Sequence, residues 1–230
     1  MKPDPSEKKY NEVIASYNKH NYESVLQGWV MRQGHISMES LCVRDQVFKN
    51  VLEVGAGSAS HLPFLGHKYQ KYFLTDKNTE MLNISAKSYE GDASILVQKQ
   101  KAQKLDYPDS FFDRLIACHV LEHLPNPYLV LREWHRVVKP GGVISILLPC
   151  DPGLLWMIGR KLSGYKRYRK DGVDMNYWMA REHINPIGNL LQFIRYYFDI
   201  VDEKWWPCSL SSLNANLFYS CNITVTKINP

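Results

Sequence analysis

The hydrophobic pattern of the chain changes at about residue 50. Before this point, apolar and aromatic residues recur at helix-like spacing, which predicts one or two helices over residues 7–48. After it, short apolar runs end in turn residues, and most of them are separated by stretches long enough for a helix. This alternation is typical of a parallel sheet whose strands are joined by crossover helices. The helix-spaced positions are Tyr10, Val13, Ile14, Tyr17, Val25, Leu26, Trp29 and Val30.

Five apolar runs are the expected strands of this sheet. They cover residues 51–54, 72–75, 95–97, 114–118 and 143–148. The helix before the last of them is predicted to begin at Pro127, and the sequence Lys139-Pro140-Gly141-Gly142 stops it. After Pro149 the pattern breaks, and residues 198–201 and 217–225 restore strand character. We expect these last two runs to form an antiparallel hairpin at the sheet edge.

A glycine loop follows the first predicted strand. Gly55 and Gly57 allow a tight turn and let a ligand lie against the main chain. Nineteen residues beyond Gly57, the second strand ends in Asp76, a carboxylate placed to accept hydrogen bonds from two ribose hydroxyls. Strand, loop and acid together predict a nucleoside site. A dinucleotide site usually has Gly at the sixth motif position, where this chain has Ser60.

Five motifs now stand in order along residues 51–149. They are Glu53-Val54-Gly55-Ala56-Gly57, Asp76, Phe111-Phe112-Asp113, Val120-Leu121-Glu122-His123-Leu124 and Lys139-Pro140-Gly141-Gly142. In this order they resemble the motifs of class I S-adenosylmethionine (SAM)-dependent methyltransferases, in particular the small-molecule group called type 11. The chain departs from that family at Ala59, where a third Gly is common, and at Lys101, where an acidic residue often precedes the position of Ala102.

The resemblance implies a cofactor, S-adenosyl-L-methionine, and a Rossmann-like doubly wound α/β sheet, mostly parallel, with helices on both faces. It implies that Gly55 and Gly57 face the methionine and sugar parts of the cofactor, that Glu53 organises the loop or reaches the amino group, and that Asp76 holds the ribose. The full set of expected cofactor-binding residues is Glu53, Gly55, Ala56, Gly57, Asp76, Lys77, Ala102 and His119.

Histidines are the candidate catalytic residues. Methyl transfer from a sulfonium needs mainly positioning and a dry site, but a hydroxyl nucleophile also gains from a base, and His titrates near neutral pH. We expect His183 and His119 in catalytic roles, whereas His123 is expected to cap or pack. Expected substrate-binding residues are Tyr17, Arg167, Arg169 and His183. No metal site is predicted, because the five cysteines include no C-x-x-C pair and lack the His spacing of a zinc site.

Residues 151–195 hold most of the excess positive charge. The whole chain carries +5, and this segment has eight basic residues against four acidic ones. Within residues 154–170 an apolar stretch precedes a basic and aromatic one, which either covers an anionic substrate or contacts an anionic lipid surface peripherally. A solvated lid with a packed underside explains the same pattern. Stacking on RNA bases is disfavoured, because the segment matches no nucleic-acid module.

These observations predict a single domain over residues 1–230. Its parts are a helical cap (1–48), a SAM-binding core (49–150), a substrate lid (151–195) and C-terminal edge strands (196–230). The polar N-terminus and the lack of a long apolar run lead us to expect a cytoplasmic protein. The predicted function is methylation, O-methylation by preference, of a small anionic or sugar-like acceptor. The alternatives are a membrane lipid or quinone as acceptor, and a non-catalytic nucleoside-binding or RNA-associated module. The sequence does not predict an oligomeric state.

Overall fold

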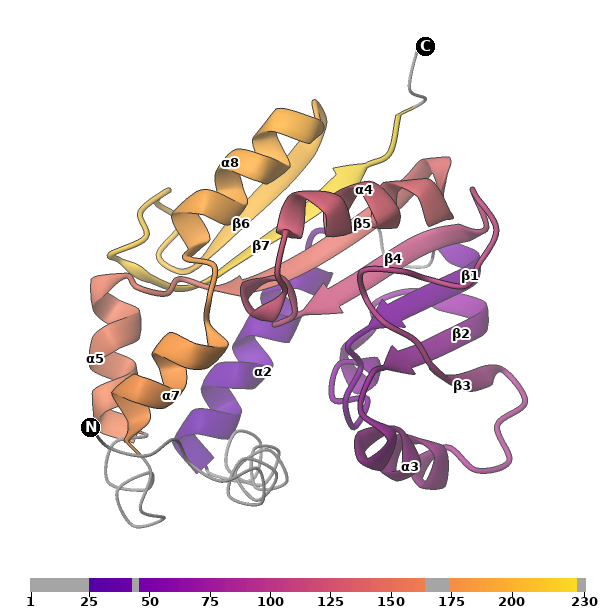
Figure 1. Cartoon of the computed structure of the whole chain (residues 1–230), viewed down its shortest axis with the longest axis horizontal. Helices are drawn as coiled ribbons and strands as arrows, with labels where there is room; N and C mark the ends of the chain where they lie inside the picture. The colour runs from indigo at the N-terminus through magenta and orange to yellow at the C-terminus, as the bar shows by residue number, and fades with distance from the viewer. Residues whose placement is uncertain (1–24, 43–45, 164–173, 227–230) are drawn as a thin grey trace.

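A computed structural model describes residues 25–42, 46–163 and 174–226. Its centre is a seven-stranded sheet with the strand order β3-β2-β1-β4-β5-β7-β6 (Figure 1). The strands are β1 (Val47–Val54), β2 (Lys68–Asp76), β3 (Ile95–Lys99), β4 (Phe112–Cys118), β5 (Val138–Pro149), β6 (Val201–Pro207) and β7 (Asn216–Thr224).

The direction of the strands confirms the predicted fold class. Strands β1 to β5 pair in parallel, whereas β7 pairs antiparallel with both β5 and β6. The C-terminal hairpin therefore closes one edge of a doubly wound sheet. The strand order reverses between β1 and β4, which is the place where sheets of this kind bind ligands beyond the carboxyl ends of their strands.

Strand boundaries differ from the prediction at two places. Most of the expected run 198–201 is the connection between α8 and β6, since Phe198 caps the helix and β6 begins only at Val201. Strand β5 starts at Val138, five residues before the predicted start, and so includes the Lys139–Gly142 turn residues. Its register with β4 shifts between Phe112 and Arg114, so pairing resumes after an irregularity that apolar runs do not indicate.

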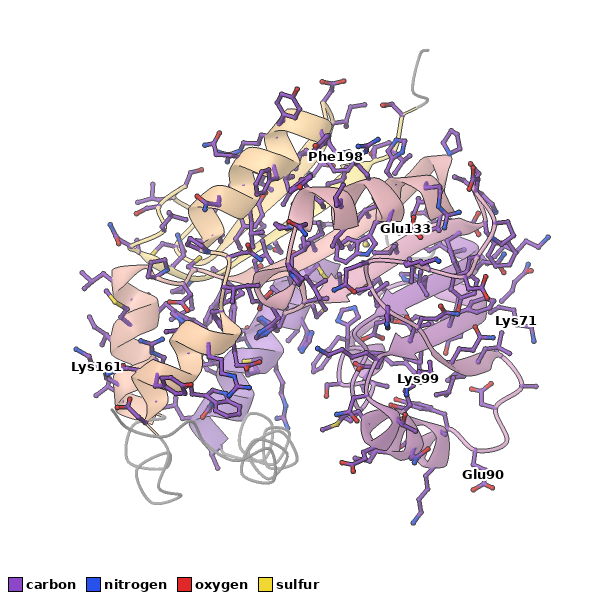
Figure 2. All side chains as sticks on the ribbon, in the orientation of Figure 1. Lys71, Glu90, Lys99, Glu133, Lys161 and Phe198 are labelled. Atoms are coloured by element: carbon purple, nitrogen blue, oxygen red, sulfur yellow. The ribbon has the colours of Figure 1, made fainter. Side chains whose placement is uncertain are left out.

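Helices α4 (Pro127–Val137) and α8 (Ile187–Tyr197) pack against each other and against one face of the sheet (Figure 1). Glu133 of α4 and Phe198 at the end of α8 lie in this layer (Figure 2). Trp134 is fully buried between the layer and the sheet. The predicted lid segment 151–195 therefore contains two kinds of structure, because most of α8 belongs to the core layer.

Helix α2 (Val25–Glu39) covers β5, β6 and β7 from the other face, where a second apolar core forms. Part of the helical structure predicted for residues 7–48 is present as α2. However, the residues that α2 buries are mostly not those of the predicted apolar stripe, Val25, Leu26, Trp29 and Val30. Val25 and Trp29 are 94% and 50% exposed, while Gly34 packs on Phe218 so closely that a Cβ would lie 3.1 Å from its ring. A small residue allows close approach, and Val25, Leu26 and Trp29 of the predicted stripe are exposed, whereas Met31 is buried in the core.

A buried ion pair fastens α2 to the sheet. Arg114, fully buried in β4, donates from Nη2 and Nη1 to the Glu39 carboxylate at 2.7 and 3.2 Å and from Nε to Ser145 at 3.0 Å. His61 lies 3.0 Å from the same carboxylate. Burial alone would raise the pKa of Glu39, but the hydrogen bond with His61 and the charge of Arg114 outweigh it and hold this pKa well below its usual range.

Helices α5 (Leu154–Ser163) and α7 (Met175–Glu182) lie beyond β7 and beside α2 (Figure 1), whereas α3 (Thr79–Ser88) covers the far end against β2 and β3. Lys161 on α5 and Lys71 on β2 lie at opposite sides of the molecule (Figure 2). Within the described ranges, none of the helices has the length and apolar character needed to cross a membrane.

Candidate active site

A cavity of about 300 Å³ lies at the carboxyl ends of β1, β2 and β4, within the size range of pockets that hold small molecules and cofactors. Its walls come from segments far apart in the sequence: the glycine loop, the end of β2, the turn after β4 and the end of α7. The lining includes the glycine loop, several polar side chains and three histidines: Glu53, Gly55, Ala56, Gly57, Asp76, Lys77, Gln100, Ala102, Gln103, His119, His123, Trp178, Glu182 and His183.

The glycine loop needs its glycines for two different reasons. Gly55 has φ +65°, and a Cβ there would lie 2.6 Å from Cγ2 of Val120. Gly57 has φ +54°, but a Cβ on it would meet nothing within 4 Å, so it borders open space. Ala59 stands where the resembling family often has Gly, and it also adopts a positive φ, +60°. The loop therefore keeps the left-handed conformation at Ala59, although only glycine is favoured there.

Asp76 lies at the end of β2 and faces the same loop. Its Oδ2 accepts a hydrogen bond from Gly57 N at 3.0 Å, and its Oδ1 accepts one from Asn78 N at 2.8 Å. Each carboxylate oxygen has capacity for a second hydrogen bond, so Asp76 can also accept from two ribose hydroxyls. The open space beside Gly57 and this placement of Asp76 fit the nucleoside part of S-adenosyl-L-methionine.

Glu53 is a buried carboxylate at the base of the loop. It is 2% exposed, and its Oε2 accepts a hydrogen bond from the Tyr72 hydroxyl at 2.7 Å. Burial raises the pKa of this carboxyl, against the opposing effects of His61 and Tyr72. The structure thus places Glu53 at the end of β1, buried and lining the cavity rather than exposed on the surface.

Residues 100–103 border the part of the cavity in which the resembling family holds adenine, and their arrangement differs from a simple contact with the backbone of Ala102. Ala102 lines the cavity, but its carbonyl accepts a hydrogen bond from Trp134 Nε1 at 3.0 Å. Lys101 is exposed and lies outside the lining set, whereas Gln100 and Gln103, which the sequence reasoning missed, are part of it. Two amides therefore border the place where the family often has a carboxylate. Lys77 lines the cavity and is largely exposed.

The turn after β4 carries His119 and Glu122. His119 has φ +57°, an uncommon conformation for a residue with a Cβ, and local strain of this kind often occurs at functional sites. Glu122 is 2% exposed, and neither of its carboxylate oxygens accepts a hydrogen bond within standard geometric limits from the described residues. His119 Nδ1 lies 3.5 Å and His123 Nε2 3.9 Å from Glu122 Oε1. Burial would raise the pKa of Glu122, but the side chain of His119 and the charge of His123 outweigh this effect and lower it.

Two histidine rings meet beside Glu122. The rings of His123 and His183 cross edge to face with centroids 4.9 Å apart. His123 Nδ1 lies 2.9 Å from the Glu182 carbonyl, and His183 Nδ1 lies 2.8 Å from Asp151 Oδ2. Each contact places the ring proton on Nδ1 and leaves Nε2 as the basic nitrogen. Burial lowers the pKa of His123, and the nearby His183 lowers it further.

Asn185 explains why His183 reaches this turn. Its side-chain amide donates to the carbonyls of Leu121 and Leu124 at 2.9 and 2.7 Å, and its backbone N–H donates to the carbonyl of Glu122 at 3.1 Å. Residues 121–123 form a short 3-10 helix, so His123 precedes α4, which begins at Pro127 as predicted. The two chain segments are therefore joined at three hydrogen bonds.

The cavity brings together most of the site residues expected from the sequence. Glu53, Gly55, Ala56, Gly57, Asp76, Lys77, Ala102, His119 and His183 all line it. Tyr17, Arg167 and Arg169 lie outside the described residues, so their expected contacts with substrate stay predictions. Sequence reasoning assigned no role to Glu122 or Asp151. Glu122 stood inside a quoted motif, but only its burial distinguishes it, and Asp151 had no signal in the sequence.

Comparison with known proteins agrees with this geometry. The family model described as "Methyltransferase domain" matches residues 52–146. The chain is 26% identical to the ubiquinone/menaquinone biosynthesis C-methyltransferase UbiE of Coxiella burnetii, over 65% of this chain and 64% of that protein. It is 32% identical to a phosphatidylethanolamine N-methyltransferase of Cereibacter sphaeroides, over 50% of this chain and 59% of that protein. The chain thus spans less than two thirds of the length of these relatives.

The same class appears among solved structures. A SAM-dependent methyltransferase from Aquifex aeolicus superposes with a TM-score of 0.57 at 17% identity, covering 98% of this chain and all of that one. The chain therefore has the class I SAM-dependent methyltransferase fold. Residues 52–146 form a methyltransferase domain of this class, for which S-adenosyl-L-methionine is the cofactor.

Proposed function

We propose that the chain is a SAM-dependent methyltransferase that acts on a small-molecule acceptor through an oxygen nucleophile. The observation that carries this proposal is the continuity of the cavity, which runs from Gly57 and Asp76 to the polar group of His123 and His183. Cofactor and acceptor ends therefore share one cavity. When bound, S-adenosyl-L-methionine supplies a methyl group on a positively charged sulfur.

The chain's own residues would position the reactants and handle a proton. The glycine loop and Asp76 hold the cofactor, and Trp178, which is buried, limits the entry of water at the acceptor end. Asp151 fixes the His183 ring, so that Nε2 is the nitrogen available for an acceptor hydroxyl. Among the described residues that line the cavity, Lys77 is the single lysine or arginine. Arg167 and Arg169, which lie outside the described residues, stay the predicted contacts for an anionic acceptor.

Asp76→Ala is expected to raise the Kd for S-adenosyl-L-methionine about 100-fold. Two hydrogen bonds to a charged acceptor are lost, each of them contributing roughly 1.5–3 kcal/mol, and about 1.4 kcal/mol corresponds to a tenfold change. Calorimetric titration of the wild type and the variant measures this directly. Asp202→Ala removes an exposed carboxylate from β6 and serves as the matched control, with an unchanged Kd. A change of less than about threefold in Asp76→Ala would contradict the proposed cofactor site.

The reaction itself is tested with isotopically methyl-labelled S-adenosyl-L-methionine and a metabolite extract. We expect mass spectrometry to find one class of labelled product with the wild type and none with Asp76→Ala. Fragmentation of the product then identifies the methylated atom. Tight cofactor binding without any labelled product would instead favour the non-catalytic alternative.

A lipophilic acceptor is the second candidate. Leu154, Ile158 and Leu162 share one face of α5, since they are spaced by four residues, and they are 54%, 44% and 81% exposed. Arg160 and Lys161 stand in the last turn of the same helix. An exposed apolar face with nearby basic residues suits an anionic lipid surface. Relatives named as quinone and phosphatidylethanolamine methyltransferases support this candidate.

The double variant Ile158→Glu with Leu162→Glu is expected to reduce co-sedimentation with vesicles of phosphatidylglycerol at least about tenfold. Insertion of each apolar side chain contributes roughly 1.5–3 kcal/mol, and glutamate also adds repulsion from the anionic surface. Leu210→Glu is the matched control, because Leu210 is 70% exposed but lies outside α5. If the wild type binds these vesicles no better than the double variant, the lipophilic candidate fails.

A further inference from the structure

His123 and His183, which line the acceptor end of the cavity, and Glu122, which lies beside them outside the lining, have the chemistry of a cation site. One ligand atom from each of Glu122, His123 and His183 lies within 4.8 Å of the others. A zinc-like ion with bonds of about 2.0–2.2 Å separates its ligands by roughly 3.3 Å, so small side-chain rotations close the set around an ion. Two imidazoles and one carboxylate suit first-row divalent transition ions.

The surroundings of these side chains supply a second, independent observation. Both Glu122 oxygens are buried and make no hydrogen bond within standard limits among the described residues, so their stabilisation depends on the more distant imidazoles of His119 and His123. A bound ion would give these oxygens a close partner, which buried carboxylates usually have. Each histidine already uses its Nδ1, through the Glu182 carbonyl for His123 and through Asp151 for His183. Metal-binding histidines usually donate the N–H of their other ring nitrogen to a carbonyl or carboxylate, which fixes the orientation of the ring.

The charges around the three side chains also favour a cation. Two carboxylates, Glu122 and Asp151, lie within the group, and Arg160 approaches Asp151 only to 4.0 Å. His119 borders Glu122 from the side of β4. The local charge is therefore negative when the histidines are neutral, and a dication would balance it.

A second histidine cluster in the molecule does not have this arrangement. His35, His61 and Cys118 also offer atoms within 4.8 Å of one another. However, His61 uses both ring nitrogens, Nδ1 towards His35 at 3.0 Å and Nε2 towards Glu39 at 3.0 Å. It has no nitrogen left for an ion, so this cluster is a hydrogen-bonded part of the core.

We propose that Glu122, His123 and His183 bind a divalent transition-metal ion at the acceptor end of the cavity. Three protein ligands leave coordination positions open, as in other sites where an ion meets a substrate. In the proposed function, on which this second step rests, an acceptor hydroxyl occupies an open position, and the ion favours loss of its proton to water before the oxygen takes the methyl group. Nε2 of His183 is then a ligand of the ion, and the ion takes over the activation of the hydroxyl that was assigned above to this nitrogen.

The test uses the whole chain, stripped of metal with a chelator and titrated with Co²⁺ and Zn²⁺. We expect one ion per chain by calorimetry, with visible cobalt bands and no thiolate-to-cobalt charge-transfer band. His183→Ala and Glu122→Gln are expected to weaken binding more than about 100-fold, and Asp151→Asn about 10–100-fold through the ring that it orients. Cys118→Ser is the control for the second cluster and should bind cobalt as the wild type does.

Two further measurements separate the outcomes. The Kd for S-adenosyl-L-methionine should stay near the wild-type value in Asp151→Asn, because Asp151 is not part of the cavity lining. Metal binding without methyl transfer would uphold the ion site and reject the proposed function. Absence of ion binding in the wild type, equal binding in His183→Ala and Glu122→Gln, or loss of binding in Cys118→Ser alone would each overturn the ion site.

Discussion

Arg114→Met is expected to lower the free energy of unfolding by about 3–5 kcal/mol. The arginine is fully buried and bonded twice to Glu39, so its removal leaves a buried carboxylate without its main cation. Urea unfolding followed by circular dichroism measures the change. Arg195→Met is the matched control, because Arg195 pairs with Glu203 at the surface, where such pairs contribute about 0–1 kcal/mol.

A variant of Glu39, the partner of Arg114, and the pH dependence of stability both test whether an unpaired buried charge causes this loss. Combining Glu39→Met with Arg114→Met should cost less than Arg114→Met alone, since no unpaired charge then stays buried. The pKa of Glu39 is held low in the folded protein, so its contribution to stability is complete above the ordinary carboxyl range. That contribution is lost as the pH falls below about 4.5, where the unfolded chain takes up the proton. An equal acid sensitivity in wild type and double variant would contradict the assignment.

Gly55→Ala is expected to raise the Kd for S-adenosyl-L-methionine at least about 30-fold. Its Cβ would overlap Val120, which is buried, and the left-handed backbone adds strain, for roughly 2–4 kcal/mol in total. To remove the overlap with Val120, the loop must move, and this movement would break the hydrogen bond from Gly57 N to Asp76. Calorimetric titration with the cofactor and thermal unfolding measure the two consequences separately.

Gly91→Ala provides the matched control for this loop variant. Gly91 also has a positive φ, +88°, but a Cβ on it meets nothing within 4 Å, and it does not line the cavity. It should therefore lose about 1–2 kcal/mol of stability from backbone strain alone and bind the cofactor normally. Similar cofactor affinities in Gly55→Ala and Gly91→Ala would show that the approach of the loop to Val120 is unimportant.

Local patterns in the sequence predicted the sheet and the cofactor end of the cavity. A buried parallel strand appears as a short apolar run whatever surrounds it, so the runs around Val54, Ile95 and Ala117 identified their strands. The glycine loop and Asp76 were found for the same reason, because a tight turn after a strand and a carboxylate at the end of the next one are local requirements.

Local sequence patterns did not predict which face of α2 is buried, because packing against the sheet determines it. The apolar residues of α2 gave the helix correctly, but Val25 and Trp29 face outward, and Gly34 makes the close contact with Phe218. In a sequence, a glycine inside a helix indicates only a low helix propensity. Whether the missing side chain makes room for an aromatic ring depends on the strand that packs against the helix.

The sequence by itself determined the fold class, the positions of most strands along the chain and the nucleoside-binding loop, since each follows from periodicity and backbone conformation within a few residues. Only the tertiary structure decided that Glu39 meets Arg114 and that His183 meets Glu122. These contacts join residues 75 and 61 positions apart, which have no common periodicity. The acceptor end of the site therefore depends on how Asn185 fastens one segment to another, a long-range contact that local sequence patterns do not encode.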